Sequence, residues 1–554
     1  MADGVDVHVS RQPDLDNACP GRLACGPYQL IFKSVSPRGS FNLLYNMIEY
    51  CDVEGRLLRI KCKNLQRFGV LFGSGLECSA HAESVNKARS HPPAERYAFA
   101  FAKAEGYRAD GWGIFEPLKE YDRLGLPDAK WRLSTANRDF KMCPSYPKHL
   151  IVPADVDDAT LAEMAEFRHL RRFPIVRYIH PKTRAPLLVA SQPLSGTKDV
   201  RCYEDERMFR SILQAGPNPD KNGYIIDLRS KDDATGFKSK GGGSESIDHY
   251  FGWNPEGPDG KRRPVHADLG KEQALTDALA KFADACVSTD MSSFVARADA
   301  SGWLHYIKTT LSTAVVVSRI LVREALPVVI HASTGCDVEL QVLSLAQLFM
   351  DQHFRTFEGF KQLIEKEWID LGYPFESRSS SAEAGPARPN ASKSARFMAP
   401  VFILFLDCVW QCLKQYPCAF EFNEAFLLAL AEHSQASRFG TFLYDCQNER
   451  EAAGLADKTL SFWGFCDEPD EIRRFKNVFY EPLPGWIKPS FRPQSIQAWL
   501  ALYGAGTPYL DFHDEVHELL MFLKDKRDTA KEEIELKQAE LAELEKQMAA
   551  AGLE

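Results

Sequence analysis

The sequence predicts a multidomain protein of combined α+β and α/β class, with a small antiparallel β-domain, a larger α/β domain and a C-terminal coiled coil. Its 554 residues exceed what a single hydrophobic core usually serves. Apolar side chains recur with a period of two early in the chain, whereas strand-type and helix-type segments alternate from about residue 150 onward. The last segment carries a heptad pattern. Together these three observations predict three structural parts.

Short strand-type segments separated by turns fill the first part, which we place at residues 1–105. Within "LLRIKCK", one face carries Leu58, Ile60 and Cys62 and the other carries Arg59, Lys61 and Lys63. This alternation is typical of a half-buried strand. The basic face fits either an ordinary solvated surface or a weak contact with phosphoinositide membranes, and the sequence leaves both interpretations open.

The second part, residues 106–505, has the texture of an α/β domain. Its strand-type runs are "RFPIVRYIH", "PLLVASQPL", "GYIIDLRS" and "LPVVIH", and its helix-type runs include "ALTDALAKFADACV" and "SGWLHYIKTTLSTAVVVSRILV". The Ser/Ala/Pro-rich segment near residues 376–396 has almost no apolar content, which predicts a disordered insert. The apolar segment "APVFILFLDCVWQCLKQYPCAFEFNEAFLLALAEH" then predicts buried helices that return the chain to the core.

The third part, residues 511–554, predicts a coiled coil. Its a and d positions are Val516, Leu520, Leu523, Arg527, Ala530, Ile534, Lys537, Leu541, Leu544, Met548 and Ala551. Most of these are apolar and charged residues lie between them, as in a coiled-coil seam. Arg527 and Lys537 would meet like charges in a homodimer, so the seam favours a heteromeric partner. A single amphipathic helix docked on its own domain is the alternative.

Composition and charge exclude several classes of function. The net charge is −9, and most of that excess lies in residues 511–554, so no broad basic surface indicates nucleic-acid binding. The 14 cysteines form no Cys-x-x-Cys pair, and we therefore expect reduced thiols, no metal site and no cofactor. The N-terminus lacks an apolar signal sequence and no apolar run reaches the roughly 18 residues of a membrane span. These features predict a cytoplasmic protein that touches membranes only peripherally.

The segment "VVIHASTGCDVELQVLSLAQLFM" has the outline of an anion-binding turn. Its apolar run ends at Ile330, and Val342, Leu345, Ala346 and Phe349 then recur at helical spacing. The small polar loop between them would point backbone N–H groups at a helix N-terminus, where the helix dipole favours an anion. A Cys-dependent phosphatase also needs a thiolate at the start of such a loop and an arginine six residues later.

This loop resembles the signature His-Cys-Ser-Asp-Gly-Trp-Asp-Arg-Thr of the myotubularin family of phosphoinositide 3-phosphatases. Aligned without gaps, the positions are His331, Ala332, Ser333, Thr334, Gly335, Cys336, Asp337, Val338 and Glu339. The alignment places Ala332 at the nucleophile and Val338 at the arginine, as in the catalytically inactive branch of the family. Further blocks such as "WRLSTANRDFKMCPSYP", "RRFPIVRYIH", "GGGSES" and "GFKQLIEKEWIDLGYPF" resemble family segments in the family's order.

The resemblance implies an N-terminal PH-GRAM-like domain, a Cys-dependent-phosphatase-like domain and a coiled coil, which agrees with the three parts. It also indicates a second departure from active members, which carry an Asn-Ala-x-Ala-Asn-Lys run before a Gly-rich turn. The corresponding run here begins at Asp233 and has neither Asn. The residues retained beside the former pocket are Lys238, Gly241, Gly242 and Gly243.

Catalysis by the family mechanism is therefore not expected, and we assign no catalytic residue. Ala332 cannot form a phosphoenzyme, and Cys336 lies four residues too late in the loop to replace the nucleophile. The family implies that Asp337 is the general acid, but an acid alone has no intermediate to assist. With Glu339 adding a second negative charge beside Asp337, we expect the loop to repel a phosphate group.

The resemblance implies a pseudophosphatase adaptor. Such a protein would pair through its coiled coil with an active myotubularin phosphatase and regulate its stability, activity or placement on endomembranes. Two alternatives remain open: an unconventional phosphatase that uses a thiol such as Cys336, and a membrane-binding module that acts through the PH-GRAM-like domain.

Overall fold

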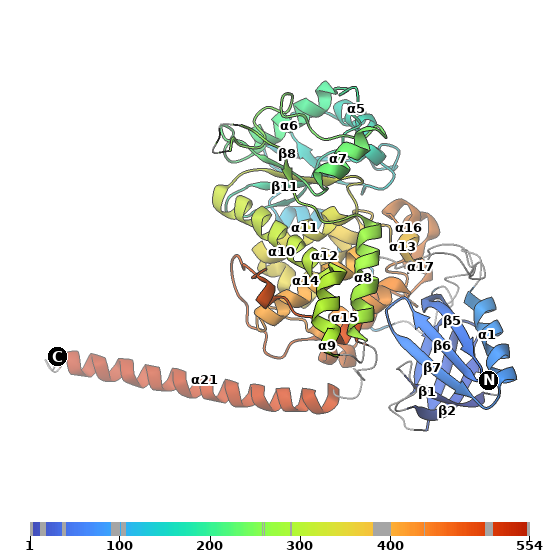
Figure 1. Cartoon of the computed structure of the whole chain (residues 1–554). Helices are drawn as coiled ribbons and strands as arrows, with labels where there is room; N and C mark the ends of the chain where they lie inside the picture. The colour runs from blue at the N-terminus through green and yellow to red at the C-terminus, as the bar shows by residue number, and fades with distance from the viewer. Residues whose placement is uncertain are drawn as a thin grey trace.

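The computed structural model describes residues 4–10, 18–35, 40–89, 100, 107–257, 259, 261–287, 291–379, 400–436, 438–504 and 513–550. Figure 1 shows three parts: a β-domain that contains the N-terminus, a larger body of helices around a second sheet, and a long helix that extends away from that body to the C-terminus. The predicted fold class is confirmed.

The β-domain is one antiparallel sheet in the order β4-β3-β2-β1-β7-β6-β5, with the helix α1 (Gly75–Arg89) against it. The strands are β1 (Val5–Ser10), β2 (Cys19–Cys25), β3 (Gln29–Ser34), β4 (Phe41–Leu44), β5 (Ile48–Glu54), β6 (Leu57–Cys62) and β7 (Arg67–Phe72). Period-two alternation in β6 is confirmed, because Leu58, Ile60 and Cys62 are buried. The sequence interpretation did not include β1 or α1.

The β-domain also contacts the larger body. Ala436, at the end of the helix α15 (Glu424–Gln435), belongs to the hydrophobic core of the β-domain. Arg67 on β7 forms an ion pair with Asp284 on the helix α8 (Glu272–Cys286). The two domains therefore share both apolar and charged contacts.

The larger body is built around a five-stranded sheet in the order β10-β11-β14-β12-β13. Its strands are β10 (Ile175–Ile179), β11 (Pro186–Ser191), β12 (Tyr224–Asp227), β13 (Val265–His266) and β14 (Val328–Ala332), and β8 (Trp131–Ser134) pairs separately with β9 (Leu150–Pro153). Only β10 is antiparallel to its neighbour. The four predicted strand-type runs correspond to β10, β11, β12 and β14.

Helices cover both faces of this sheet (Figure 1). One side carries α5 (Asp158–Phe167), α6 (Tyr203–Ala215) and α7 (Lys231–Lys238), and the other carries α10 (Trp303–Arg319), α11 (Val338–Met350) and α14 (Pro400–Gln415). The remaining helices of eight or more residues are α9 (Met291–Ser301) and α12 (Phe357–Ile364). The shorter helices are α4 (Pro117–Arg123), α13 (Phe375–Ser379), α16 (Gln447–Ala453), α17 (Leu455–Lys458), α18 (Phe462–Cys466), α19 (Pro469–Phe475) and α20 (Leu500–Tyr503). All 13 residues of α11 are buried, so the loop before it is anchored on a helix enclosed by the core.

The predicted insert is wrong at its start. Residues 376–379 belong to α13, and Ser377 donates a backbone hydrogen bond to the Asp445 carboxylate at 3.0 Å. Phe375 holds this helix in place because its ring packs among Tyr373, Phe402 and Phe442. The rest of the predicted insert, 380–396, lies outside the described residues.

The C-terminal segment is one helix, α21 (His513–Ala550). Within the described part of the chain, no helix is both long enough and apolar enough to span a bilayer.

Candidate functional site

The loop after β14 lies at the edge of the sheet where three parallel strands end. β14 is the central strand, with Ala332 opposite Ser191 of β11 and His331 opposite Asp227 of β12. The carboxyl ends of parallel strands form the usual ligand edge of such a sheet. The topology therefore places residues 331–339 in the position of an α/β binding site.

Gly335 gives the loop its tight return. Its φ is +76°, a left-handed conformation that side-chain-bearing residues rarely adopt. A Cβ there would lie 3.0 Å from the Ala190 carbonyl carbon and from the Ser191 nitrogen. The loop can pack this closely on β11 only with glycine at this position.

The carboxylate of Glu339 occupies the concave side of this loop. Its Oε1 accepts hydrogen bonds from the backbone N–H of Ala332 at 2.8 Å and of Gly335 at 2.7 Å. Its Oε2 accepts one from the N–H of Asp337 at 3.0 Å, and the side chain is fully buried. Three backbone donors thus converge on one internal carboxylate, as they would on a bound oxyanion.

Two arginines surround this loop at close range. Arg172, which is fully buried, donates to the carbonyl of Gly335 at 2.8 Å and to the carbonyl of Leu371 at 2.8 Å. On the other side, Arg378 donates to Asp337 Oδ2 at 2.7 Å and also pairs with Glu272. The loop therefore lies among cations as well as backbone dipoles, and its two carboxylates are not unopposed negative charges.

Asp337 is the residue that the family motif assigns as general acid, and both Glu339 and Arg378 act on its carboxylate. Burial and the nearby negative charge of Glu339 raise the pKa of Asp337 to about 7. The ion pair with Arg378 favours the charged carboxylate and opposes this shift. Asp337 is thus engaged in the packing of α13 against the loop.

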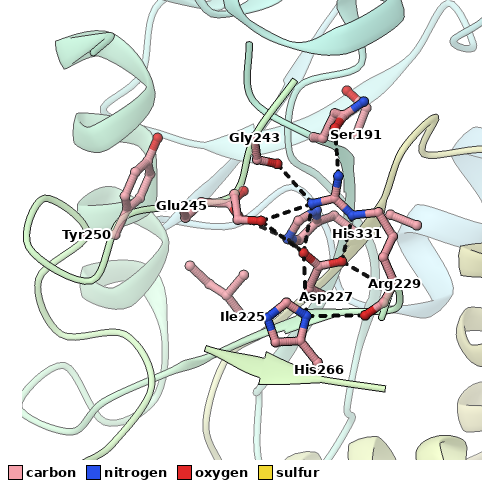
Figure 2. A network of polar contacts seen from close by, with 12 residues as sticks. Ser191, Ile225, Asp227, Arg229, Gly243, Glu245, Tyr250, His266 and His331 are labelled. Carbon is pink, nitrogen blue, oxygen red and sulfur yellow. Dashed lines mark hydrogen bonds and ion pairs between the residues drawn. The ribbon is translucent and has the colours of Figure 1, made fainter. Parts of the chain in front are cut away.

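His331 lies beneath the loop in a buried polar network (Figure 2). Its Nε2 is 2.9 Å from Glu245 Oε2 and 3.9 Å from Asp227 Oδ2. Burial alone would lower the pKa of His331, but the charges of Glu245 and Asp227 raise it overall. Burial would raise the pKa of both Glu245 and Asp227, but the charge of His331 lowers it, together with Arg168 at Glu245 and Arg229 at Asp227. The two carboxylates therefore favour the protonated form of His331.

Two further arginines complete the network. Arg168 bonds both Asp205 oxygens and donates to Glu245 Oε1 at 2.6 Å. Arg229 grips Asp227 through two hydrogen bonds of 2.8 and 2.7 Å, as Figure 2 shows. Each buried carboxylate has a cationic partner, which is the condition for keeping charges in a core.

The Gly-rich turn packs against the same edge. The Gly243 carbonyl accepts from Arg229 at 2.9 Å, and a Cβ on Gly242 would lie 2.3 Å from the side-chain oxygen of Gln192. Gly241 adopts a φ of +89°. Lys238, by contrast, points to Asp199 in a partly exposed ion pair of 2.9 Å. The glycines therefore lie beside the loop's sheet edge, whereas the ammonium of Lys238 is paired elsewhere.

The remaining loop positions offer no reactive group. Ala332, Cys336 and Val338 are buried, and Ser333 and Thr334 are half-buried. Burial raises the pKa of the Cys336 thiol to about 11, although Arg172 opposes the shift, so the thiol is protonated at neutral pH. Among the described residues, no group of three or more His, Cys, Asp or Glu side chains is placed to hold a metal ion.

A second candidate site is the apolar stripe of α21. The seam residues Leu523, Ile534, Leu541 and Leu544 are 46 to 58% exposed. The side chains of Leu520 and Met548 lie outside the described residues. α21 contacts the body through ion pairs that Arg527 and Lys531 form with Glu481. Leu523, Ile534, Leu541 and Leu544 thus do not dock on the body, whereas the seam residue Arg527 contacts it. Both the coiled coil and the alternative of a helix docked on its own domain stay predictions.

Sequence reasoning missed most of the polar residues around the loop. Arg172, Asp227, Arg229 and Glu245 fall inside blocks that resembled the family, but the pattern assigned them no role. Arg378 lay in the segment predicted to be disordered. The role of Glu339 was also misjudged: its carboxylate is the group that the loop's N–H donors bind, not an additional unopposed anion.

Comparison with known proteins identifies the family. The family model described as "Myotubularin-like phosphatase domain" matches residues 96–451 of this chain. Myotubularin-related protein 9 of Mus musculus is 37% identical over 489 residues, which cover 88% of this chain and 86% of that protein. The Caenorhabditis elegans protein of the same name is 37% identical, over 81% of this chain and 77% of its own length. Phosphatidylinositol-3,5-bisphosphate 3-phosphatase MTMR8 of Homo sapiens is 32% identical over 85% of this chain and 65% of that protein. This chain belongs to the myotubularin family.

Proposed function

We propose that this chain is a pseudophosphatase adaptor: it pairs through α21 with an active myotubularin phosphoinositide 3-phosphatase and regulates that partner's stability, activity or placement on endomembranes. The main support for an inactive domain is the amino-acid composition of the loop. Ala332 stands where the family motif has its nucleophile, and Val338 stands where it has its arginine. A hydrocarbon at each position supplies neither a covalent intermediate nor an anion clamp.

The structure of the loop supports this proposal. Glu339 fills the position toward which the backbone N–H groups point, so a substrate phosphate would have to displace a buried carboxylate. Removing one transition-state donor typically costs about 10²- to 10³-fold in rate. Here the nucleophile, the arginine and access to the backbone donors are all affected, and we expect no measurable turnover.

The adaptor role is supported by α21. The exposed side chains of Leu523, Ile534, Leu541 and Leu544 lie at a and d positions of a heptad pattern, which is the arrangement that pairs helices. Arg527 and Lys537 at seam positions disfavour pairing with a second copy, because each would meet a like charge. Each already has an acidic partner in its own chain, Glu481 and Glu540 respectively. The class of partner comes from the name of a relative, phosphatidylinositol-3,5-bisphosphate 3-phosphatase MTMR8.

The two alternative functions receive less support. An unconventional phosphatase would need a reactive thiol, but Cys336 is buried and its pKa is raised to about 11 by burial. Membrane binding by the β-domain would use its basic face, but Arg59 and Lys61 are paired with Glu54 at 2.8 Å and Glu49 at 3.1 Å. A weak phosphoinositide contact through this PH-GRAM-like domain is therefore at most an accessory to pairing.

Co-purification tests the adaptor proposal. The full chain and a truncation that ends at residue 504 are each co-expressed with a tagged phosphatidylinositol-3-phosphate phosphatase of the same family. We expect the full chain to co-purify in a fixed ratio and the truncation to be lost, while both remain folded by circular dichroism. Equal recovery of the two forms would refute pairing through α21.

A further inference from the structure

We propose that the loop from Ala332 to Asp337 is an intact oxyanion-binding site whose resident ligand is the carboxylate of Glu339. The chemical class of ligand is an oxyanion with two or more oxygens, such as a carboxylate or a phosphate. In this chain the site is filled from within, so the loop is held in its binding conformation without any external ligand.

The number and direction of the donors support this assignment. The N–H groups of Ala332 at the end of β14, of Gly335 in the loop and of Asp337 at the helix cap all reach one carboxylate, at 2.7 to 3.0 Å. An ordinary helix cap binds N–H groups of the first helical turn only. Here all three donor residues precede the first helical residue, Val338, so Glu339 ties the end of β14 and the loop to the start of α11.

The surrounding charges support it independently. Arg229 lies in the network beneath the loop. Burial lowers the pKa of Arg229, but Asp227 raises it overall, and the negative charges of Glu245 and Glu339 act in the same direction. Arg172 holds the Gly335 carbonyl from the other side and is likewise within electrostatic reach of Glu339. A fully buried carboxylate is stable only with such compensation, and the same cations would compensate a bound phosphate.

An internal ligand has two consequences. The loop keeps its shape in the absence of substrate, so the phosphatase-like domain remains folded as a scaffold. An external phosphate is excluded by competition, because the donors are already used. Loss of the Glu339 carboxylate should make the stability of the loop depend on an added oxyanion.

Thermal unfolding of the full chain in phosphate and in chloride at equal ionic strength and pH tests this inference. Wild type should unfold at the same temperature in both salts. Glu339→Ala should unfold at a lower temperature in chloride and recover by about 2–4 °C or more in phosphate, because binding to the folded state alone raises the midpoint. An unchanged midpoint for Glu339→Ala in phosphate would overturn the inference.

Glu367→Gln is the matched control. Glu367 is also fully buried, but it pairs with Arg177 and Gln347, not with loop N–H groups. It should lose stability without any rescue by phosphate. Rescue of the control to the same extent would show a general salt effect and would also overturn the inference.

Hydrogen exchange on Glu339→Gln covers the case in which the alanine variant does not fold. The amides of Ala332, Gly335 and Asp337 should exchange faster than in wild type in chloride, and phosphate should restore their protection. Unchanged protection in the glutamine variant would contradict the role of the carboxylate. Pairing through α21 plays no part in the contact between Glu339 and the loop. A negative result in the co-purification experiment therefore leaves the phosphate-rescue experiment unaffected, and the reverse also holds.

Discussion

At the scale of single residues, Glu339 holds the backbone of a loop that lacks the cysteine and the arginine of the family motif. The backbone donors of the loop are in place although the motif's arginine is not, and the side chain of Glu339, seven residues after Ala332, is their acceptor. Such a substitution replaces the stabilisation that a ligand would give with a permanent intramolecular contact. A buried N–H group without an acceptor costs about 1–3 kcal/mol, and this carboxylate satisfies three of them.

The pairing of His331 with Glu245 makes a prediction about pH. Because the pKa of His331 is raised in the folded chain, its contribution to the free energy of unfolding is fully present below the unfolded pKa of about 6.5 and is lost as the pH rises through the folded value. Glu245 behaves oppositely, since its pKa is lowered: its contribution is lost as the pH falls below about 4. The network should stabilise most between these limits.

His331→Gln should therefore lower the free energy of unfolding by about 3–5 kcal/mol near pH 6, because it leaves buried carboxylates short of a cation. The deficit should shrink as the pH rises to 9. Urea unfolding at several pH values measures it, with the exposed His305→Gln as control. A deficit that stays constant with pH would mean that His331 is not charged in the folded chain.

Cys336 should be chemically inert. With a pKa of about 11, only about one thiol in a thousand is ionised at pH 8. We expect iodoacetamide to label Cys336 at least about 100-fold more slowly than the exposed Cys418 in the native chain, and at a similar rate after unfolding. Peptide mass spectrometry follows both sites at once. Comparable native labelling rates would revive the unconventional phosphatase.

At the scale of elements, hydrophobic periodicity predicted four strands of the central sheet and several long buried helices, but not the polar contacts between them. The strand, loop and helix of 326–351 were predictable because the apolar run and the helical spacing are both local signals. The carboxylate of Glu339 folds back on the loop only because the backbone turns at Gly335, and no spacing in the sequence encodes that turn's exact direction. The sequence thus located the candidate site without identifying what fills it.

Two errors at this scale have the same physical origin. β1 was missed because its pairing with β7 joins residues 7–10 to residues 69–72, a contact far apart in sequence. The predicted insert began too early because composition does not predict long-range packing. The ring of Phe375 packs against the distant Phe402 and Phe442, and this contact orders the residues that follow it. Long-range contacts decided both cases.

The helix α21 makes the most specific prediction about an element. Leu541→Asp with Leu544→Asp places charges in the proposed seam, and burying each leucine contributes about 1.5–3 kcal/mol. We expect the double variant to weaken pairing with the active relative by more than about 100-fold. Quantitative pull-down over a range of partner concentrations measures this loss.

Leu536→Asp is the control for this pair. Leu536 is 60% exposed on the same helix but lies outside the a and d positions. Its substitution should leave pairing within about threefold of wild type. Equal damage from both changes would show that the heptad assignment is wrong.

At the scale of the whole molecule, the three parts have different relations to function. The β-domain and the phosphatase-like domain share packing through Ala436 and the Arg67–Asp284 pair, so they form one platform. α21 meets that platform mainly through Glu481 and leaves its apolar stripe outward. This arrangement fits the proposed regulatory role, in which α21 pairs with another protein.

Release of phosphate from phosphatidylinositol 3-phosphate vesicles tests the pseudophosphatase adaptor most directly. This chain alone should release none, and adding it to an active myotubularin relative should change that enzyme's rate, whereas the Leu541→Asp/Leu544→Asp variant should not. Phosphate release by this chain alone, or an enzyme rate that is the same with wild type, with the variant and with neither, would contradict the account.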